Sequence, residues 1–409
     1  MSEQVAHKER EYLSPNEKAL KRLLKNRPAV GGFIVIVLAV LIAVFGYLLT
    51  PDSTPYANDQ VLEIATEPPG FEIDMLKVRK NRAEKDESFL TLLMTGRENL
   101  YKLVPIKEYE FDSTNIIVHR YTGSANTADI DTFNLVEVVY PVSAAENNIR
   151  TNGQEITFLD LEEKEQKASI AALQTMVKEN HIEEKSYVLG TDKFGRDTLS
   201  RLILGVRISL SIGLMAVLIS LIIGITIGAI GGYFGGVVDD MVMWLINVFW
   251  SIPLLLLVFA LVLTLGRDFW QIYLAVGLTM WVEVARIVRG QILSLREQEY
   301  VEAAKSLGFG HVRIITRHIL PNIVGPLVVV TAANFASAII IEAGLSFLGI
   351  GVQPPTPSWG TMLNEYRNYI GTDKAYLALF PGIAISVMVL AFNLLGNGLR
   401  DALDVKTQV

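Results

Sequence analysis

The chain has 409 residues, 51% of them hydrophobic and only 19% charged, and its formal net charge is −7. Soluble domains carry about 25% charged residues, so this composition excludes a disordered or fibrous protein and argues against a purely soluble one. The acidic total also argues against a nucleic-acid binder. Because the sequence has no cysteine, a disulfide framework, a thiolate nucleophile and a cysteine-based metal site are excluded.

The first apolar run, residues 29–49, contains no charged side chain and is long enough to cross about 30 Å of hydrocarbon. A basic stretch precedes it, which places the N-terminal segment 1–28 in the cytoplasm. A cleaved signal peptide is the competing interpretation, but the run is long and no small-x-small cleavage site follows it. We therefore predict a retained transmembrane helix over residues 29–50.

Residues 51–188 differ from the rest of the chain in charge. They hold 14 Lys+Arg and 25 Asp+Glu, a net charge of −11, whereas all other residues together carry +4. Residues 116–118 and 133–142 are rich in β-branched and aromatic side chains, which predicts strands, and the periodicity of residues 159–180 predicts a helix. We therefore expect an inserted α+β domain over residues 51–188.

Five further apolar runs predict membrane-spanning helices. They cover residues 208–232, 241–266, 272–288, 327–347 and 375–395. The predicted fold is an all-α polytopic membrane protein with six transmembrane helices, five of them in a core over residues 189–404. Six spans that begin in the cytoplasm also end there, so the tail 405–409 is predicted to be cytoplasmic and residues 51–188 extracytoplasmic.

The distribution of basic residues agrees with this orientation. The segment between the fourth and fifth spans would be cytoplasmic, and it contains Arg289, Arg296, Lys305, Arg313 and Arg317. The short outer loops contain few basic residues. This is the bias that cytoplasmic loops of membrane proteins show.

Three charged residues lie inside or at the edges of the predicted spans. They are Glu283, Arg286 and Glu342. Charges are costly in lipid, so we expect these side chains to face other helices or a translocation pathway. Glu283 and Arg286 are three residues apart and could form an ion pair on one helix face. Glu342 could line the pathway or hold helices together.

The second and third spans contain residues that shape helices. Gly224, Gly228 and Gly232 repeat the G-x-x-x-G spacing, which permits a close helix crossing. Pro253 should kink the third span and free backbone carbonyls there. We take all four as candidate helix-interface or pathway residues.

An amphipathic stretch, residues 195–209, precedes the second span. Its basic residues are Arg196, Arg201 and Arg207. Long basic side chains can lie along an apolar surface and place their charge at the headgroups. We therefore expect the stretch to lie along the outer membrane interface.

Motifs for catalysis or nucleotide binding are missing from the sequence. The pattern G-x-x-x-x-G-K-[ST] does not occur, so the chain lacks that device for holding nucleotide phosphates. Five histidines are scattered along the chain, at His7, His119, His181, His311 and His318. Their spacing favours packing roles over a metal site. We expect no catalytic residue, bound metal or cofactor; a membrane-embedded hydrolase would need a paired nucleophile and base, and the sequence shows neither.

The segment after the fourth span carries the strongest local pattern. Residues 299–308 form helices readily and end at Gly308, and Pro321 begins a new element after a second basic stretch. A short helix-turn-helix projecting from the bundle would present Ala303 and Ala304, whose small side chains let another protein approach. The alternative is an ordinary amphipathic connector on the membrane surface.

Several blocks of the sequence resemble a known family. Glu302-Ala303-Ala304, Gly308 and Leu320-Pro321 resemble the EAA loop of ABC-importer permeases. The blocks LGTD, GRD and SR within residues 189–201, LSFLGIG at 345–351, PPTPSWG at 354–360 and FNLLGNGLRDAL at 392–403 are similar to the C-type permease subunit of dipeptide and oligopeptide importers. The resemblance covers the N-terminal anchor and residues 189–404.

The resemblance implies a function and a set of partners. The chain would form half of a translocation pathway in the bacterial cytoplasmic membrane, beside a second homologous permease. Two cytoplasmic ABC ATPase subunits would bind ATP and Mg²⁺, and an extracytoplasmic binding protein would deliver peptides. The coupling loop 290–323 would dock on an ATPase through Glu299, Glu302, Ala303, Ala304, Gly308, Leu320 and Pro321.

The sequence also departs from this family. Residues 51–188 have no counterpart, and Asn247 and Asn397 stand where aspartates are expected. Two alternatives stay open. The cargo could be a nickel chelate or another small solute, because sister systems share these blocks. The chain could instead be a sensor or export component that acts through its outer domain without an ATPase.

Overall fold

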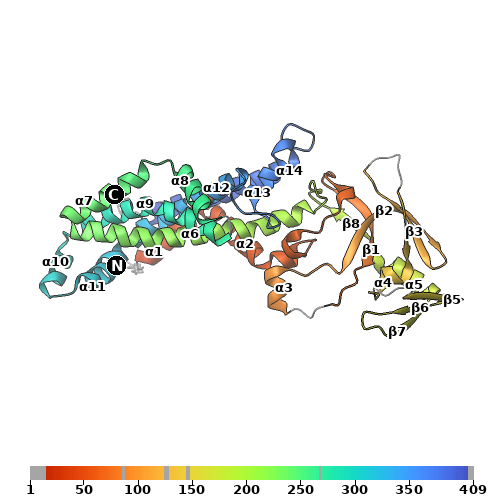
Figure 1. Ribbon diagram of the computed structural model, residues 1–409. Coiled ribbons are helices and arrows are strands. Elements are labelled where there is room, and N and C mark those ends of the chain that lie inside the picture. Colours follow the sequence, from red (N-terminus) through yellow and green to blue (C-terminus); the bar gives the residue numbers. More distant parts are fainter. Residues whose placement is uncertain (1–14, 85–87, 124–128, 144–147, 267–268, 404–409) are drawn as a thin grey trace, which may run out of the picture.

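The computed structural model describes residues 15–84, 88–123, 129–143, 148–266 and 269–403. The molecule is elongated, with a helical bundle at one end and two β-sheets at the other (Figure 1). His7, the first half of the predicted N-terminal segment and the predicted tail 405–409 lie outside the described residues.

The bundle contains eleven of the described α-helices. They are α1 (Pro15–Lys25), α2 (Arg27–Leu49), α6 (Thr198–Phe234), α7 (Gly236–Trp250), α8 (Leu254–Leu265), α9 (Phe269–Leu295), α10 (Glu299–Ser306), α11 (His311–Ile314), α12 (Val324–Phe347), α13 (Trp359–Tyr366) and α14 (Tyr376–Leu403). Within the described residues, five helices are long and apolar enough to cross a membrane, or six if the bent pair of α7 and α8 counts as one span. The prediction of a polytopic helical protein is confirmed.

The third predicted span is broken. Helices α7 and α8 meet at 87°, and Pro253 is the N-cap of α8 with an extended backbone (φ −54°, ψ 123°). Proline has no N–H to continue the hydrogen bonds of α7, so the chain turns here. The predicted bend at Pro253 is confirmed, but residues 241–266 form two helices and not one continuous kinked helix.

Helices α6 and α9 cross at very short range. A Cβ atom added at Gly224 would lie 2.5 Å from Cβ of Val284, and one added at Gly228 would lie 2.9 Å from Cβ of Val288. Real Cβ atoms do not approach so closely, so only glycine allows this backbone separation. Gly232 continues the row, 3.0 Å from Cβ of Ile292 by the same measure.

The segment between α2 and α6 contains the two antiparallel sheets. The five-stranded sheet has the order β4 (Ile130–Asn134), β3 (Asn115–Arg120), β2 (Tyr101–Asp112), β1 (Phe71–Arg79) and β8 (Ile182–Tyr187). The three-stranded sheet has the order β5 (Ile149–Asn152), β6 (Glu155–Leu159) and β7 (Glu165–Ser169). Three helices accompany them: α3 (Phe89–Thr95), α4 (Leu135–Val139) and α5 (Ile170–Met176).

One apolar core joins the two sheets to α4 and α5. Leu76, Ile116, Leu135, Phe158 and Leu173 all belong to it, and none is more than 3% exposed. Burial of apolar area stabilises such a core by about 25 cal/mol per Å². Since the chain has no cysteine, this core holds the segment together without disulfides.

Two predictions within this segment need correction. Residues 133–142 are a strand only as far as Asn134, whose side chain then accepts a hydrogen bond from the backbone N–H of Val136 (3.0 Å) and begins α4. Residues 159–180 contain strand β7 before α5 begins. Ile156 pairs with Ala168 across β6 and β7, so the sheet ladder overrides the helix propensity of residues 165–169.

Candidate functional site

The coupling segment lies at the end of the bundle farthest from the sheets (Figure 1). It runs from α10 through α11 and a π-helical turn, Ile315–Ile319, to a 3₁₀ turn, Leu320–Ile323. Pro321 occupies the first turn of that last element, where its missing N–H costs no hydrogen bond. The structure thus brings Glu299, Leu320 and Pro321 into one compact projection.

Gly308 ends α10 in a left-handed conformation. Its φ is +76°, its N–H donates to the carbonyl of Lys305 (2.9 Å), and the next N–H donates to the carbonyl of Ala304 (3.2 Å). This is the glycine-ended helix terminus that favours positive φ. No atom lies within 4 Å of an added Cβ, so the backbone conformation, not lack of space, selects glycine.

The two faces of α10 have different surroundings. Val301 and Ala304 are buried against the bundle, together with Ile314 from α11. Ala303, Glu299 and Glu302 are exposed. Of the two alanines predicted to face a partner, only Ala303 is exposed, because Ala304 packs inward and is 3% exposed.

Large apolar side chains are also exposed on the outer surface of the segment. Leu307 is 73% exposed and Val312 is 75% exposed, one on each side of the turn at Gly308. Apolar side chains so accessible beside a buried, well-packed core indicate a surface that another protein can cover.

Polar contacts fix the coupling segment to the bundle. The Tyr233 hydroxyl lies 3.1 Å from Nδ1 of His311, and the Lys305 ammonium lies 5.7 Å from the centre of the Tyr233 ring. Helix α9, which leads into the coupling segment, is in turn joined to α7: the Arg289 guanidinium donates to both carboxylate oxygens of Asp239 (2.5 and 2.6 Å). A bidentate pair of this kind holds two helices in a defined orientation.

Glu283 and Arg286 are not joined by an ion pair among the described residues, which corrects the expected pairing. Arg286 instead lies over the ring of Trp250, with its guanidinium carbon 3.9 Å from the ring centre. Both charged side chains are exposed and line a cavity of about 500 Å³. Glu283 also lines a larger cavity of about 640 Å³ between α9, α12 and α14.

Glu342 lies at a helix interface. It is fully buried, and its carboxylate accepts hydrogen bonds from the hydroxyls of Ser346 (2.8 Å) and Ser209 (3.3 Å). Ser346 is on the same helix, α12, whereas Ser209 belongs to α6. The structure therefore places Glu342 between helices, the second of its two predicted positions.

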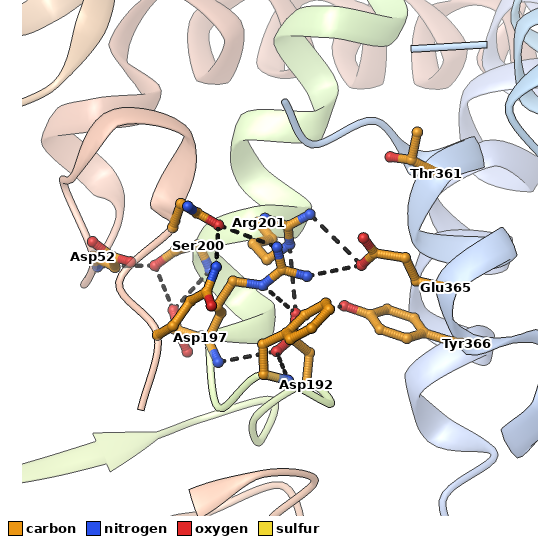
Figure 2. Close-up of polar contacts among 12 residues, drawn as sticks. Asp52, Asp192, Asp197, Ser200, Arg201, Thr361, Glu365 and Tyr366 are labelled. Carbon is orange, nitrogen blue, oxygen red and sulfur yellow. Dashed lines mark hydrogen bonds and ion pairs between the residues drawn. The ribbon is translucent and has the colours of Figure 1, made fainter. Parts of the chain in front are cut away.

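A buried charge network joins the loop before α6 to α6 and α13 at the sheet end of the bundle (Figure 2). Asp192 is its centre: one carboxylate oxygen accepts from the backbone N–H groups of Phe194 (2.8 Å) and Arg196 (3.0 Å), and the other accepts from Nε of Arg196 (2.6 Å). The Arg196 guanidinium also donates to Glu365 on α13 (2.8 Å). The Tyr366 hydroxyl donates to Asp192 (3.3 Å).

Arg201 completes this network. It is fully buried, with a guanidinium nitrogen 3.8 Å from Asp192 and another 3.8 Å from Glu365. Two arginines therefore balance two carboxylates, which a buried site requires because an unpaired charge there is costly. Burial also raises the pKa of Asp197, whose side chain caps α6 by accepting from the backbone N–H of Ser200 (2.8 Å).

The network overturns the expected interfacial position of Arg196 and Arg201. Arg196 and Arg201 are 2% and 0% exposed, so they do not reach lipid headgroups, and residues from Thr198 onward belong to the continuous helix α6. Sequence reasoning missed the site. The available sequence signal was Asp192 three residues before Gly195, which predicts a tight turn around the carboxylate; in the structure Gly195 has a φ of +70°.

Further bonds attach the base of the sheets to this network. Two hydrogen bonds join Thr191 and Glu67. The backbone N–H of Thr191 donates to the backbone carbonyl of Glu67 (3.0 Å), and the backbone N–H of Glu67 donates to the Thr191 hydroxyl (2.9 Å). The Tyr376 hydroxyl at the start of α14 donates to the carbonyl of Glu67 (3.0 Å). In the described part of the chain, no group of three or more His, Asp or Glu side chains is arranged to hold a metal ion.

Two family models match the sequence. Residues 224–409 match the binding-protein-dependent transport system inner membrane component, and residues 14–69 match the N-terminal TM domain of oligopeptide transport permease C. The chain is 48% identical over 217 residues to the glutathione transport system permease protein GsiD of Shigella flexneri serotype 5b (strain 8401), which covers 53% of this chain and 71% of the relative.

The corresponding protein of Pectobacterium atrosepticum is 43% identical over 218 residues, covering 53% of this chain and 72% of the relative. Among solved structures, an inward-facing MetNI methionine ABC transporter chain aligns with a TM-score of 0.42 and 19% identity, over 50% of this chain and 97% of that one. The chain belongs to the family of binding-protein-dependent transport system inner membrane components, and it is the permease subunit of an ABC importer.

Proposed function

We propose that the chain imports small peptides, together with a second homologous permease, two cytoplasmic ABC ATPases and an extracytoplasmic binding protein. The observation that carries this proposal is the coupling segment. It projects from one end of the bundle with Ala303, Leu307 and Val312 exposed, and a buried core supports it from behind. ATP and Mg²⁺ would be bound by the ATPase subunits.

The segment is built to transmit a displacement. Val301 and Ala304 of α10 pack in one apolar cluster with Val288 and Ile292 of α9. The ion pair of Arg289 with Asp239 joins the same stretch of α9 to α7. A movement of α10 would therefore reach the spanning helices as a rigid-body shift, the kind of transition that packed helices undergo.

The arrangement also supports an orientation. The coupling segment is basic and lies at the end of the bundle opposite the sheets, and basic loops face the cytoplasm. In this orientation residues 51–188 form an extracytoplasmic α+β domain, and both termini lie in the cytoplasm of a bacterial cell. The absence of native cysteine makes a direct test possible. Leu24→Cys on α1 should react with a membrane-impermeant maleimide only after permeabilisation, and Leu62→Cys in intact spheroplasts; both side chains are 64% exposed.

The cargo pathway would pass beside α9. Glu283 and Arg286 are exposed on a helix of the membrane span, and charged side chains do not face lipid without a large cost. They therefore face the second permease or water. A pair of opposite charges beside cavities of about 500 and 640 Å³ suits a small zwitterionic cargo. The names of the relatives point to glutathione, a small peptide.

The coupling assignment is tested with Leu307→Asp in the complete complex, reconstituted in vesicles with its binding protein. A charge in a docked apolar surface should abolish uptake and the stimulation of ATP hydrolysis by loaded binding protein. Ile130→Asp is the matched control, because Ile130 is 60% exposed in the sheet segment. Normal stimulation in Leu307→Asp, with the complex intact, would refute the assignment.

Substitutions at Gly308 separate the turn from the docking surface. Gly308→Asn should keep much of the transport rate, because asparagine tolerates positive φ. Gly308→Val should lose it, since a β-branched residue at this φ (+76°) forces the turn to open. Equal activity of the two variants would show that the turn does not matter for coupling.

The cargo is tested separately in the same vesicles. Uptake of labelled glutathione, of a dipeptide and of a nickel chelate should be compared at equal concentration of the loaded binding protein. Competition by unlabelled glutathione or dipeptide supports the peptide proposal. Transport of the nickel chelate alone would overturn it and leave the coupling assignment unaffected.

A further inference from the structure

The helix α3 in the sheet segment is unusual because most of its large apolar side chains are left uncovered by the described part of the chain. Its sequence is FLTLLMT, and none of its seven residues is buried. Phe89, Leu90 and Met94 are 61%, 66% and 62% exposed. Large apolar residues of one short helix, exposed side by side, mark a surface that contacts a partner or a membrane.

The position of α3 is fixed by contacts with spanning helices. The Arg207 guanidinium on α6 donates to the carbonyl of Met94 (2.8 Å) and lies 3.3 Å from that of Leu93, which satisfies the last turn of α3. The backbone N–H of Arg97 donates to the carbonyl of Ser53 (2.9 Å), just after α2. A Cβ added at Gly96 would lie 2.7 Å from the Tyr47 ring.

These contacts place α3 at a definite depth along the bundle. Arg207 directly precedes the apolar run 208–232, and its guanidinium carbon lies 5.9 Å from the centre of the Tyr47 ring near the end of α2. Arginine and tyrosine at the ends of spanning helices mark the level of the headgroups. Helix α3 therefore lies at the boundary between headgroups and hydrocarbon.

An apolar groove continues from α3 toward the middle of the span. It has a volume of about 360 Å³ and is lined by Leu93 and Met94 of α3, by α2 and by α6. Its α2 residues Val40 and Val44 lie nine and five residues before Leu49, or about 14 and 8 Å along the helix axis. The groove thus opens onto the hydrocarbon layer.

The neighbouring surface of α2 is also apolar and exposed. Leu41, Phe45 and Leu48 are 47%, 42% and 53% exposed on a helix that crosses the membrane. The exposed side of α3 extends this uncharged surface, since residues 89–95 contain no charged side chain. Lipid is therefore the occupant that the surroundings favour over a soluble protein.

We propose that α3 lies in the membrane interface, with Phe89, Leu90 and Met94 in contact with lipid acyl chains. The inserted segment would then be held to the bilayer as well as to the bundle. The sheets would then be held at a defined distance from the membrane by the lipid contact of α3, in addition to the chain connections to α2 and α6. The proposal depends on membership in a membrane permease family and not on the cargo or the coupling partner.

The test uses single cysteines in the full chain, which has none of its own, reconstituted with its partner subunits in lipid vesicles. Leu90→Cys carries an environment-sensitive fluorophore, and quenching is measured with spin labels at carbon 5 or carbon 12 of the acyl chains. Leu41→Cys on α2 is the lipid-facing control, and Ile130→Cys on β4 is the water-facing control with a similar exposure, 60%.

The proposal predicts that the probe at Leu90 emits at short wavelength and is quenched several-fold more than the probe at Ile130. Spin labels at carbon 5 should quench it more than those at carbon 12, because α3 lies near the interface. Quenching equal to that at Ile130 would overturn the proposal and place α3 in water. Short-wavelength emission without quenching would also overturn it, since a protein partner would then cover the helix.

Discussion

The two ends of the bundle use polar and apolar side chains in opposite ways. At the sheet end, Asp192, Arg196 and Arg201 are almost fully buried, while at the coupling end Leu307 and Val312 are more than 70% exposed. Buried, paired charges fix loops in one arrangement, because breaking the pairs is costly. Exposed apolar side chains leave a surface ready for a partner. The sheet end of the bundle therefore satisfies its charges internally, whereas the coupling end exposes an apolar surface that a partner can cover.

Disrupting the buried charge network at the sheet end should have the largest effect on stability. Asp192→Asn removes the centre of the network and leaves two buried arginines with a single carboxylate, Glu365, which costs about 3–5 kcal/mol. We expect a large drop in the thermal unfolding midpoint of the purified complex and low expression. The double variant Asp192→Asn with Arg201→Met restores the charge balance and should recover part of the loss. A loss equal to the sum of the two single losses would show that the residues do not act as a network.

The region between the two ends depends on a close helix crossing. Gly228→Ala should destabilise the chain by about 1–3 kcal/mol, because the new methyl group overpacks the contact with α9. Gly290→Ala on α9 is the matched control, since no atom lies within 4 Å of its added Cβ. Alanine there should be neutral or stabilising by up to about 1 kcal/mol. The measurement is the thermal unfolding midpoint of each variant in detergent, and equal midpoints would contradict the prediction.

The smallest expected effect concerns pH at the sheet end. Burial lowers the pKa of His181, whose Nδ1 lies 2.9 Å from the carbonyl of Lys77. Above about pH 7 the imidazole is neutral in both folded and unfolded chains and contributes no pH dependence. As the pH falls through about 6.5, the unfolded chain binds a proton that the folded chain does not, so stability decreases.

His181→Asn should remove this decrease. The measurement is hydrogen exchange of the amides in β1 and β8 at pH 7.5 and pH 5.5, in the variant and in the unaltered chain. Burial raises the pKa of Asp59, which changes stability with the opposite sign at lower pH, so only the difference between the two chains is informative. The same pH dependence in both chains would exclude His181 as the cause.

Patterns within single segments predicted much of this fold. The five continuous spans, the strand around residues 116–118 and the turn at Gly308 follow from apolar runs, β-branched residues and a helix-stopping glycine, because these signals act over short stretches of chain. The blocks at residues 189–201 and 392–403 indicated the permease family because each is a short, contiguous stretch that can be recognised without the fold. The exposed position of Ala303 could be expected, but not the inward packing of Ala304.

Contacts between distant residues decided the rest. Arg196 and Arg201 look like interfacial arginines until Glu365, more than 160 positions further along the chain, is brought beside them by α13. Residues 165–169 become a strand only because β6 offers a ladder. The apolar run at residues 89–95 is too short to signal a membrane contact, and its position beside the spans follows only from contacts with distant residues such as Arg207. Local sequence determines which elements form, whereas burial, charge pairing and depth in the membrane are properties of neighbours that only the tertiary structure supplies.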